Sequence, residues 1–182
     1  VFGIAFFILF ALFSPRVHAN AYEAELPAGL ASATDMCALL PCTEVFPGAT
    51  HFSERKGQPP YVEAYDKAGA DKKLLGYVML STDITDTPAY SGKPVVTLIG
   101  MDTKGIFVGV KVLKHSEPIL LLGIPESALL NFNAQYLGKS VADKIEVGQS
   151  RPDEEVLGLD AISGATVTVI AQNQVMMASG SA

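Results

Sequence analysis

Several features that would assign a function directly are missing from this sequence of 182 residues. It has only two cysteines, and no cluster of histidines accompanies them, which excludes a zinc site built from cysteine and histidine. The glycine-rich fingerprint G-x-G-x-x-G is absent, so the sequence does not predict a nicotinamide coenzyme. It also shows no catalytic constellation, such as a nucleophile with its base. The sequence therefore predicts neither a metal site nor catalytic residues.

The sequence is also poor in basic residues. Lysine and arginine number 13 against 19 aspartates and glutamates, which gives a net charge of −6. Proteins bind nucleic acids by neutralising phosphates with lysine and arginine, so this balance argues against direct nucleic-acid binding. No internal repeat is visible, and residues 20–182 are enough for one domain with a hydrophobic core.

The only long apolar stretch lies at the N-terminus, in residues 1–13, and a small-x-small pattern, Val-His-Ala, follows at residues 17–19. This arrangement predicts a secretory signal peptide over residues 1–19. The run is shorter than the ~20 residues that a bilayer span needs, and retention as a membrane anchor is the alternative. Cleavage would remove Arg16 and no acidic residue, so the net charge would change from −6 to −7.

The two cysteines, Cys37 and Cys42, lie close together in the segment Cys-Ala-Leu-Leu-Pro-Cys, where Pro41 favours a turn. In the oxidising compartment that a signal peptide implies, a local disulfide is expected, with a stabilising effect of roughly 2 kcal/mol. A redox-active pair is the alternative. We assign residues 20–60 to an N-terminal segment that contains both cysteines, and residues 61–182 to the main domain.

The order of the predicted elements indicates the fold class. The expected strands are residues 61–65, 74–80, 95–99 and 106–112. The last two flank a turn with Gly105 where a positive φ is needed, which predicts a β-hairpin. Pro125 at a first helical turn and Gly138 beyond the end predict a helix between them. Strands followed by helices indicate an α+β fold, with a twisted, mainly antiparallel sheet and flanking helices.

One stretch implies specific chemistry: residues 160–166, Asp-Ala-Ile-Ser-Gly-Ala-Thr. It resembles the D-x-x-S-G-A-T signature at which FMN is attached through its phosphate to a threonine hydroxyl, here that of Thr166. Gly164 and Ala165 leave the backbone uncovered, and a helix that begins here would direct free N–H groups and its positive end toward a phosphate. The β-branched run 166–170 also fits a strand, in which Thr166 would be an ordinary strand residue.

Further segments extend this resemblance over nearly all of the chain after residue 20. They are residues 76–78, 90–94, 98–102, 105–106 and 110–118. Together with the S-G-A-T end, they resemble the FMN-binding domain that the RnfG and NqrC electron-transfer subunits share. Within this family, residues 37–46 and 120–130 make the chain most similar to the periplasmic N-terminal domain of NosR/NirI-type membrane proteins. The H-x-E-T-P-G-L-G loop of RnfG and NqrC is altered here, because the threonine is absent and the apolar residues 119–122 separate Pro118 from Gly123.

The resemblance implies roles for the residues of the motif. Ser163, Gly164 and Ala165 would form the turn that presents Thr166 to FMN. Asp160 would be recognised by the enzyme that attaches the flavin or would orient the loop, and an ordinary role as a turn residue before a helix is the alternative.

The resemblance also implies cofactor contacts outside the motif. Tyr77 and Tyr90 would lie on the flavin ring, or would pack in the sheet. His115 and Glu117 would border the ring edge and take part in proton transfer, or would form a hydrogen-bonded pair within their loop. Lys93 would offset flavin charge, or would be solvated. The remaining predicted cofactor-binding residues are Gly92 and Gly123.

The implied function is electron transfer in the periplasm, with the domain anchored to the inner membrane in the full-length protein. The implied partners are a flavin transferase, the transmembrane and iron–sulfur parts of the parent membrane protein, and the nitrous oxide reductase system of denitrification, whose activity or maturation the domain would support. An electron-transfer module is favoured over a stand-alone enzyme. The alternatives are a flavin-loaded sensing or assembly module that regulates nitrous oxide reductase expression, and a flavoenzyme acting on a diffusible substrate.

Overall fold

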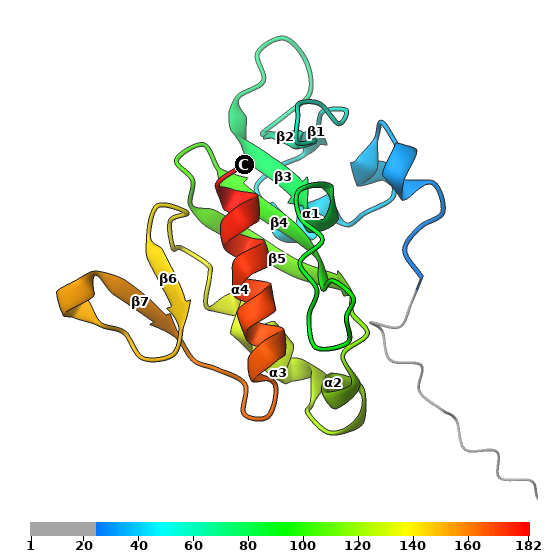
Figure 1. Cartoon of the computed structure of the whole chain (residues 1–182). Coiled ribbons are helices and arrows are strands. Elements are labelled where there is room, and N and C mark those ends of the chain that lie inside the picture. Colours follow the sequence, from blue (N-terminus) through cyan, green and yellow to red (C-terminus); the bar gives the residue numbers. More distant parts are fainter. Residues whose placement is uncertain (1–24) are drawn as a thin grey trace, which may run out of the picture.

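The computed structural model describes residues 25–182; the predicted signal peptide lies outside the described residues. An antiparallel sheet of five strands, in the order β1-β2-β3-β4-β5, forms the centre (Figure 1). Its strands are β1 (His51–Phe52), β2 (Val62–Tyr65), β3 (Leu74–Leu80), β4 (Val96–Asp102) and β5 (Phe107–Lys114). Helices pack against this sheet, so the predicted α+β fold with a mainly antiparallel sheet is confirmed.

The turn between β4 and β5 confirms the predicted hairpin. Gly105 has a φ of +79°, a conformation that a side chain would disfavour. The carboxylate of Asp102 accepts hydrogen bonds from the backbone N–H groups of Lys104, at 2.8 Å, and Ile106, at 2.9 Å. The turn is therefore held by its own first residue, as is common for aspartate in such positions.

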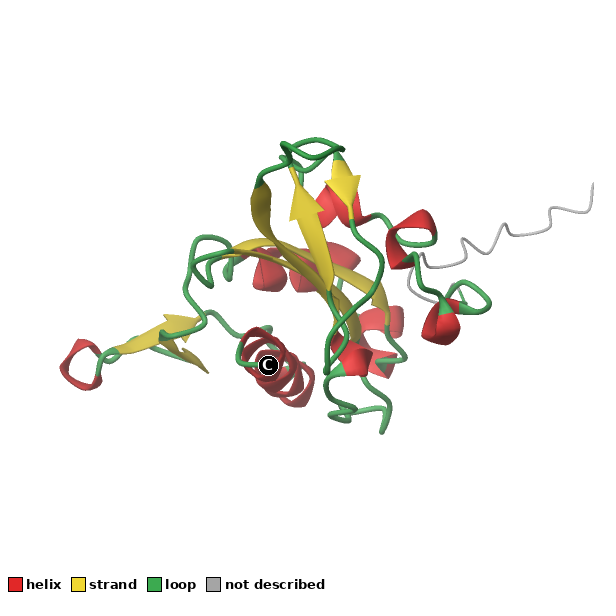
Figure 2. Cartoon of the chain, turned by 90° about the horizontal axis from the view of Figure 1, so that it is seen from above, coloured by secondary structure: helices red, strands yellow, loops and turns green. Residues whose placement is uncertain are grey.

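One short α-helix, α1 (Cys42–Val45), precedes the sheet. The other α-helices, α2 (Pro118–Leu122), α3 (Glu126–Ala134) and α4 (Thr166–Gly180), follow the hairpin, as do the remaining strands. Two further strands, β6 (Lys144–Val147) and β7 (Val156–Leu159), pair in parallel and project to the side of the main sheet (Figure 2). Within residues 25–182, no helix combines the length and apolar character that crossing a membrane requires.

The β-branched run that begins at Thr166 is helical, and the strand alternative is wrong. Buried positions in α4 recur every three or four residues: Thr168, Val169, Ala171, Gln172, Val175, Met176 and Ser179. This is the period of a helix with one face on the core. Packing against the sheet therefore overrides the strand preference of valine, isoleucine and threonine, which is a weak local effect.

The two faces of the sheet carry separate hydrophobic cores, because successive side chains of a strand point to opposite sides. In β4, Ile99 joins the core beneath α3 and α4, whereas its neighbour Leu98 joins the core on the other face. That second core is covered by α1 and by chain segments from residue 26 onward. The segment before residue 61 thus packs directly on the sheet and contributes β1 to it.

Helix α1 lies unusually close to the sheet because glycines lie beneath it. Gly100 and Gly109 are directly opposite each other in β4 and β5. A Cβ atom added at Gly109 would lie 2.1 Å from the carbonyl oxygen of Val45, and one at Gly100 would lie 2.2 Å from the same oxygen. Only residues without a side chain allow this approach.

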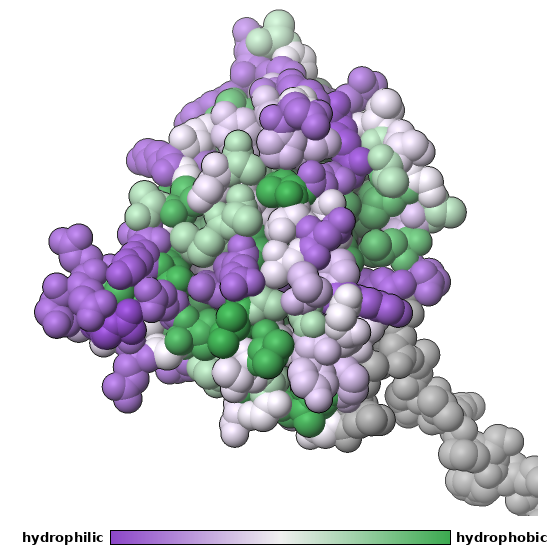
Figure 3. Space-filling view, viewed as in Figure 1, coloured by the Kyte–Doolittle hydropathy of each residue, from purple (hydrophilic) through white to green (hydrophobic). Residues whose placement is uncertain are grey.

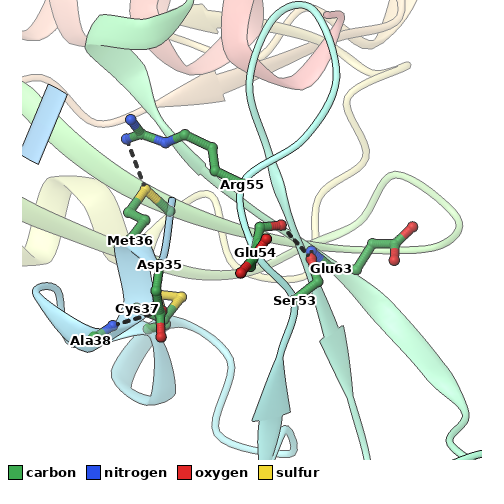
Figure 4. The surroundings of a disulfide bond; sticks show 9 residues. Asp35, Met36, Cys37, Ala38, Ser53, Glu54, Arg55 and Glu63 are labelled. Atoms are coloured by element: carbon green, nitrogen blue, oxygen red, sulfur yellow. Dashed lines mark hydrogen bonds between the residues drawn. A yellow bond between two sulfur atoms is a disulfide. The ribbon is translucent and has the colours of Figure 1, made fainter. Parts of the chain in front are cut away.

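A disulfide and an arginine secure the segment around α1 (Figure 4). Cys37 and Cys42 form the predicted disulfide. Arg55 donates hydrogen bonds to the backbone oxygens of Leu30, at 3.2 Å, and Ala31, at 3.3 Å, and it forms an ion pair with Asp83 at 3.0 Å. Burial raises the pKa of Asp83, and the charge of Arg55 opposes this effect. Arg55 therefore connects the N-terminal segment to the 3₁₀ turn Ser81–Asp83, which follows β3.

We expect the disulfide to act by stabilising the fold. Replacing both cysteines by serine should lower the free energy of unfolding by about 2 kcal/mol, because the short closed loop no longer restricts the unfolded chain. For a domain of this size, the melting temperature should fall by roughly 4–8 °C in a thermal denaturation experiment. The spectrum and reduction of a bound flavin should not change. A marked change in flavin reduction would support the redox-active pair instead.

Candidate functional site

Thr166 is the first residue of α4 and is exposed to solvent. The first N–H groups of a helix have no partner within it, and in α4 no side chain caps them because the preceding residue is Ala165. Gly164 has a φ of +83°, which turns the chain into the helix. The hydroxyl of Thr166 thus stands beside open backbone donors and the positive end of a helix of 15 residues.

A cavity of about 540 Å³ lies against this helix end. It is lined by Tyr90, Pro118, Ile119, Gly123, Gly164, Ala165, Thr166, Val167 and Thr168. Three segments far apart in the sequence form its walls: the loop before β4, helix α2 with the residue that follows it, and the start of α4. Among the described lining residues there is no lysine or arginine, so the helix end is the positive feature that the structure places there.

Glu117 lies behind the walls of this cavity and is fully buried. Its carboxylate accepts hydrogen bonds from the backbone N–H groups of Tyr90, at 3.2 Å, and Ser91, at 2.9 Å. It also accepts a short hydrogen bond from the hydroxyl of Thr168. The backbone N–H of Glu117 donates to Nδ1 of His115 at 3.2 Å, and His115 is buried as well. This contact matches the hydrogen-bonded pair that was one of the two sequence predictions.

A second polar group lies one turn further along α4, between the helix and the sheet. The side chain of Gln172 donates to Thr97 Oγ1 at 3.1 Å and to Asn133 Oδ1 at 2.8 Å, and all three residues are buried. Asn133 in turn donates to the backbone oxygen of Leu129 at 2.9 Å. These bonds connect α4 with β4 and α3.

The structure gathers part of the predicted set around the cavity. Tyr90, Gly123, Gly164, Ala165 and Thr166 line it. Asp160 and Ser163 line a neighbouring hollow of about 410 Å³ on the α3 side of the motif. There the backbone of Asp160 exchanges two hydrogen bonds with the side chain of Gln135, at 2.7 and 3.1 Å, which fixes the approach of the chain to α4.

Other predicted residues lie apart from the cavity walls. Tyr77 packs edge-to-face on Tyr61, with ring centroids 5.5 Å apart, and lines a different hollow. Gly92 and Lys93 belong to the turn that follows Tyr90, where the backbone N–H of Ala89 donates to the oxygen of Lys93 at 3.0 Å. The side chain of Lys93 is exposed. Of the two tyrosines, Tyr90 is the one beside Thr166.

Sequence reasoning missed several residues of the site. Pro118, Ile119, Val167 and Thr168 line the cavity, and Ser91 binds Glu117 through its backbone. A signal existed for Thr168 only: in a helix that begins at Thr166, it lies in the first turn and is near any group bound at the helix end. The contact of Ser91 could not be predicted, because nearly every residue type has the backbone N–H group that makes it.

Exposed apolar side chains surround the site. Tyr90 is 67% exposed, Val167 is 52% exposed and Ile170 is 44% exposed. Apolar residues gather over the lower half of α4, whereas the projecting β6–β7 pair is hydrophilic (Figure 3). The site therefore combines a hydroxyl and helix donors with an apolar rim, which suits a ligand that carries both a phosphate and a flat ring.

Comparison with known proteins agrees with this geometry. Residues 90–178 match the FMN-binding domain family. The chain is 45% identical over 105 residues to the regulatory protein NosR of Stutzerimonas stutzeri, covering 58% of this chain and 14% of the relative. It is 39% identical over 134 residues to the regulatory protein NosR of Pseudomonas aeruginosa, covering 74% and 18%. It is 30% identical over 98 residues to the protein NirI of Paracoccus denitrificans, covering 54% and 13%.

The matched family range contains Tyr90, Glu117 and Thr166, and so all three walls of the cavity. The chain spans less than a fifth of each of these curated relatives. The strands β1 to β3 precede the matched range, although they belong to the same sheet. Residues 90–178 belong to the FMN-binding domain family, and the domain is of the type found in NosR and NirI proteins.

Proposed function

We propose that this domain carries FMN attached by a phosphoester to the hydroxyl of Thr166, and that it works as an electron relay outside the cytoplasm. The observation that carries the proposal is the position of Thr166. Its exposed hydroxyl opens on a cavity of about 540 Å³ at the uncapped end of α4. The attached product would differ from protein plus FMN by the loss of one water molecule.

The residues present fit such a group. The N–H groups in the first turn of α4 would hold the phosphate, and the dipole of the helix would favour its negative charge. Tyr90, Ile119 and Val167 offer apolar surface of the kind that a flavin ring packs against. When bound, FMN would supply the redox chemistry, and the protein would set its environment.

Covalent attachment has a physical advantage in the periplasm. A flavin that dissociates there would be diluted into a compartment that supplies little of it, whereas a phosphoester is lost only by hydrolysis. A predicted secretory signal over residues 1–19 supports this location. Attachment would require a flavin transferase, and Asp160 and Ser163, which face the hollow beside the motif, are suitably exposed for recognition by it.

We further propose that the relay serves the nitrous oxide reductase system of denitrification, as part of a longer protein with membrane-spanning and iron–sulfur parts. The likeness to NosR and NirI proteins, of which this chain covers less than a fifth, supports this placement.

A second function, regulation or assembly without electron turnover, is favoured by one observation. Two of the relatives are named regulatory proteins.

An experiment on the complete membrane protein distinguishes the electron relay from regulation or assembly. With Thr166→Val, the relay predicts that electron delivery and nitrous oxide reduction are lost, because the flavin is absent, while the amount of nitrous oxide reductase is unchanged. Thr166→Ser, which keeps a hydroxyl, should restore delivery. The measurements are the rate of nitrous oxide reduction and the amount of reductase protein. Normal reduction in the valine variant would eliminate the relay, and loss of the reductase protein itself would support regulation.

A further inference from the structure

Glu117 is connected to every wall of the cavity. It directly precedes Pro118, the first residue of α2, and its carboxylate binds the backbone of Tyr90 and the hydroxyl of Thr168. These two partners lie 27 and 51 residues away in the sequence, and both line the cavity. One buried side chain thus holds together the three segments that enclose the site.

The chemistry of these contacts shows that the surroundings are organised around a carboxylate. Two neighbouring backbone N–H groups, those of Tyr90 and Ser91, point inward at its two oxygens. The hydroxyl of Thr168 donates to it as well. Burying a carboxyl group is costly unless its oxygens are hydrogen-bonded, and here both oxygens accept hydrogen bonds.

We propose that Glu117 is the positioning residue of the flavin site: it holds the Tyr90–Ser91 segment and the first turn of α4 at the separation that receives the flavin. The inference rests on the proposed attachment of FMN to Thr166. Without the carboxylate, the hydrogen bonds that join the two segments through Glu117 are lost, and the hydroxyl of Thr166 is no longer held in a fixed place relative to the opposite wall.

The experiment uses four variants of the domain. Glu117→Gln leaves one acceptor oxygen for two inward N–H groups, so it releases the Tyr90–Ser91 side. Thr168→Val keeps the shape of the side chain and releases the α4 side. Thr168→Ser keeps the hydroxyl and should therefore restore flavin attachment. Gln172→Met is the matched control, because it breaks buried hydrogen bonds on the same helix, to Thr97 and Asn133, that do not reach the cavity.

Each variant is incubated with the flavin transferase and its flavin nucleotide substrate, and attachment is followed by intact mass. We expect Glu117→Gln and Thr168→Val to gain flavin about tenfold more slowly than wild type, a change of roughly 1.4 kcal/mol in the activation barrier. Their attached flavin should also show an altered visible circular dichroism, because the ring is held differently. Thr168→Ser should match wild type in attachment rate and in circular dichroism. Gln172→Met should lower the melting temperature and change neither of these two properties.

Wild-type attachment rates and spectra in both Glu117→Gln and Thr168→Val would overturn the proposal. Equal slowing in Gln172→Met would overturn it too, since general loss of stability would then explain the effect. Failure of the proposed function is a different outcome: the wild-type domain itself would then take up no covalent flavin. Thr168→Val keeps the proposal testable even if Glu117→Gln does not fold, because it removes one neutral hydroxyl.

Discussion

The Thr166→Val domain is expected to carry no flavin after denaturation, whereas the wild-type domain stays yellow. Valine has the shape of threonine but no hydroxyl, so no phosphoester can form at this position. Position 166 is exposed and begins α4, so the substitution leaves the core untouched. The free energy of unfolding should change by less than about 0.5 kcal/mol. Intact mass gives the result directly: wild type gains FMN less one water, and the variant gains nothing.

Serine at the same position is the matched control. Thr166→Ser keeps the alcohol at the helix end and should restore the mass gain. Thr168, two residues further along, also has a hydroxyl beside the cavity, but it is buried and donates to Glu117. It should therefore not replace Thr166 as acceptor. Denaturation-resistant flavin in Thr166→Val would disprove attachment at Thr166.

The Gly109→Ala variant is expected to lose at least about 3 kcal/mol of unfolding free energy, at the upper end of the range for overpacked cores. The added Cβ would lie 2.1 Å from the carbonyl oxygen of Val45 and 2.4 Å from its Cα. Both are backbone atoms of α1, and the helix is held by the Cys37–Cys42 disulfide, so it cannot move aside at low cost. The melting temperature should fall by roughly 6–12 °C in thermal denaturation.

Gly48→Ala provides the comparison for this effect. Gly48 follows α1 closely, and a Cβ at that position would meet nothing within 4 Å. Alanine there should be neutral or stabilise by up to about 1 kcal/mol, because it restricts only the unfolded chain. If Gly109→Ala lowered the unfolding free energy no more than Gly48→Ala, the close packing of α1 on the sheet would be wrong.

Local patterns predicted the elements whose causes are local. The hairpin follows from Gly105 and the flanking strands, and α3 follows from Pro125 and the apolar positions after it. The run after Thr166 could not be assigned in this way. Its β-branched residues favour a strand, and only the buried face of α4 against the sheet decides for the helix.

The candidate site was also predicted only in part, because some of its residues are adjacent in sequence and others are brought together by the fold. The motif at residues 160–166 points to Thr166 by itself, because its members are adjacent. The partners of Glu117 come from segments 26 to 51 residues away, and two of them act through backbone N–H groups that any residue possesses. Tyr77 and Tyr90 are alike in sequence terms, and only the path of the chain places one of them at the cavity.

Buried polar contacts specify the rotation of α4 about its own axis. Hydrophobicity alone would not do so, because α4 exposes Val167 and Ile170 while it buries Thr168 and Gln172. A turn by one residue, about 100°, would bury equally apolar side chains. It would also deprive Thr97 Oγ1 and Asn133 Oδ1 of the amide donor of Gln172, which is costly in the core. The bonds of Gln172 in the middle of α4 and the bond from Thr168 to Glu117 in its first turn together specify which face of the helix packs on the sheet.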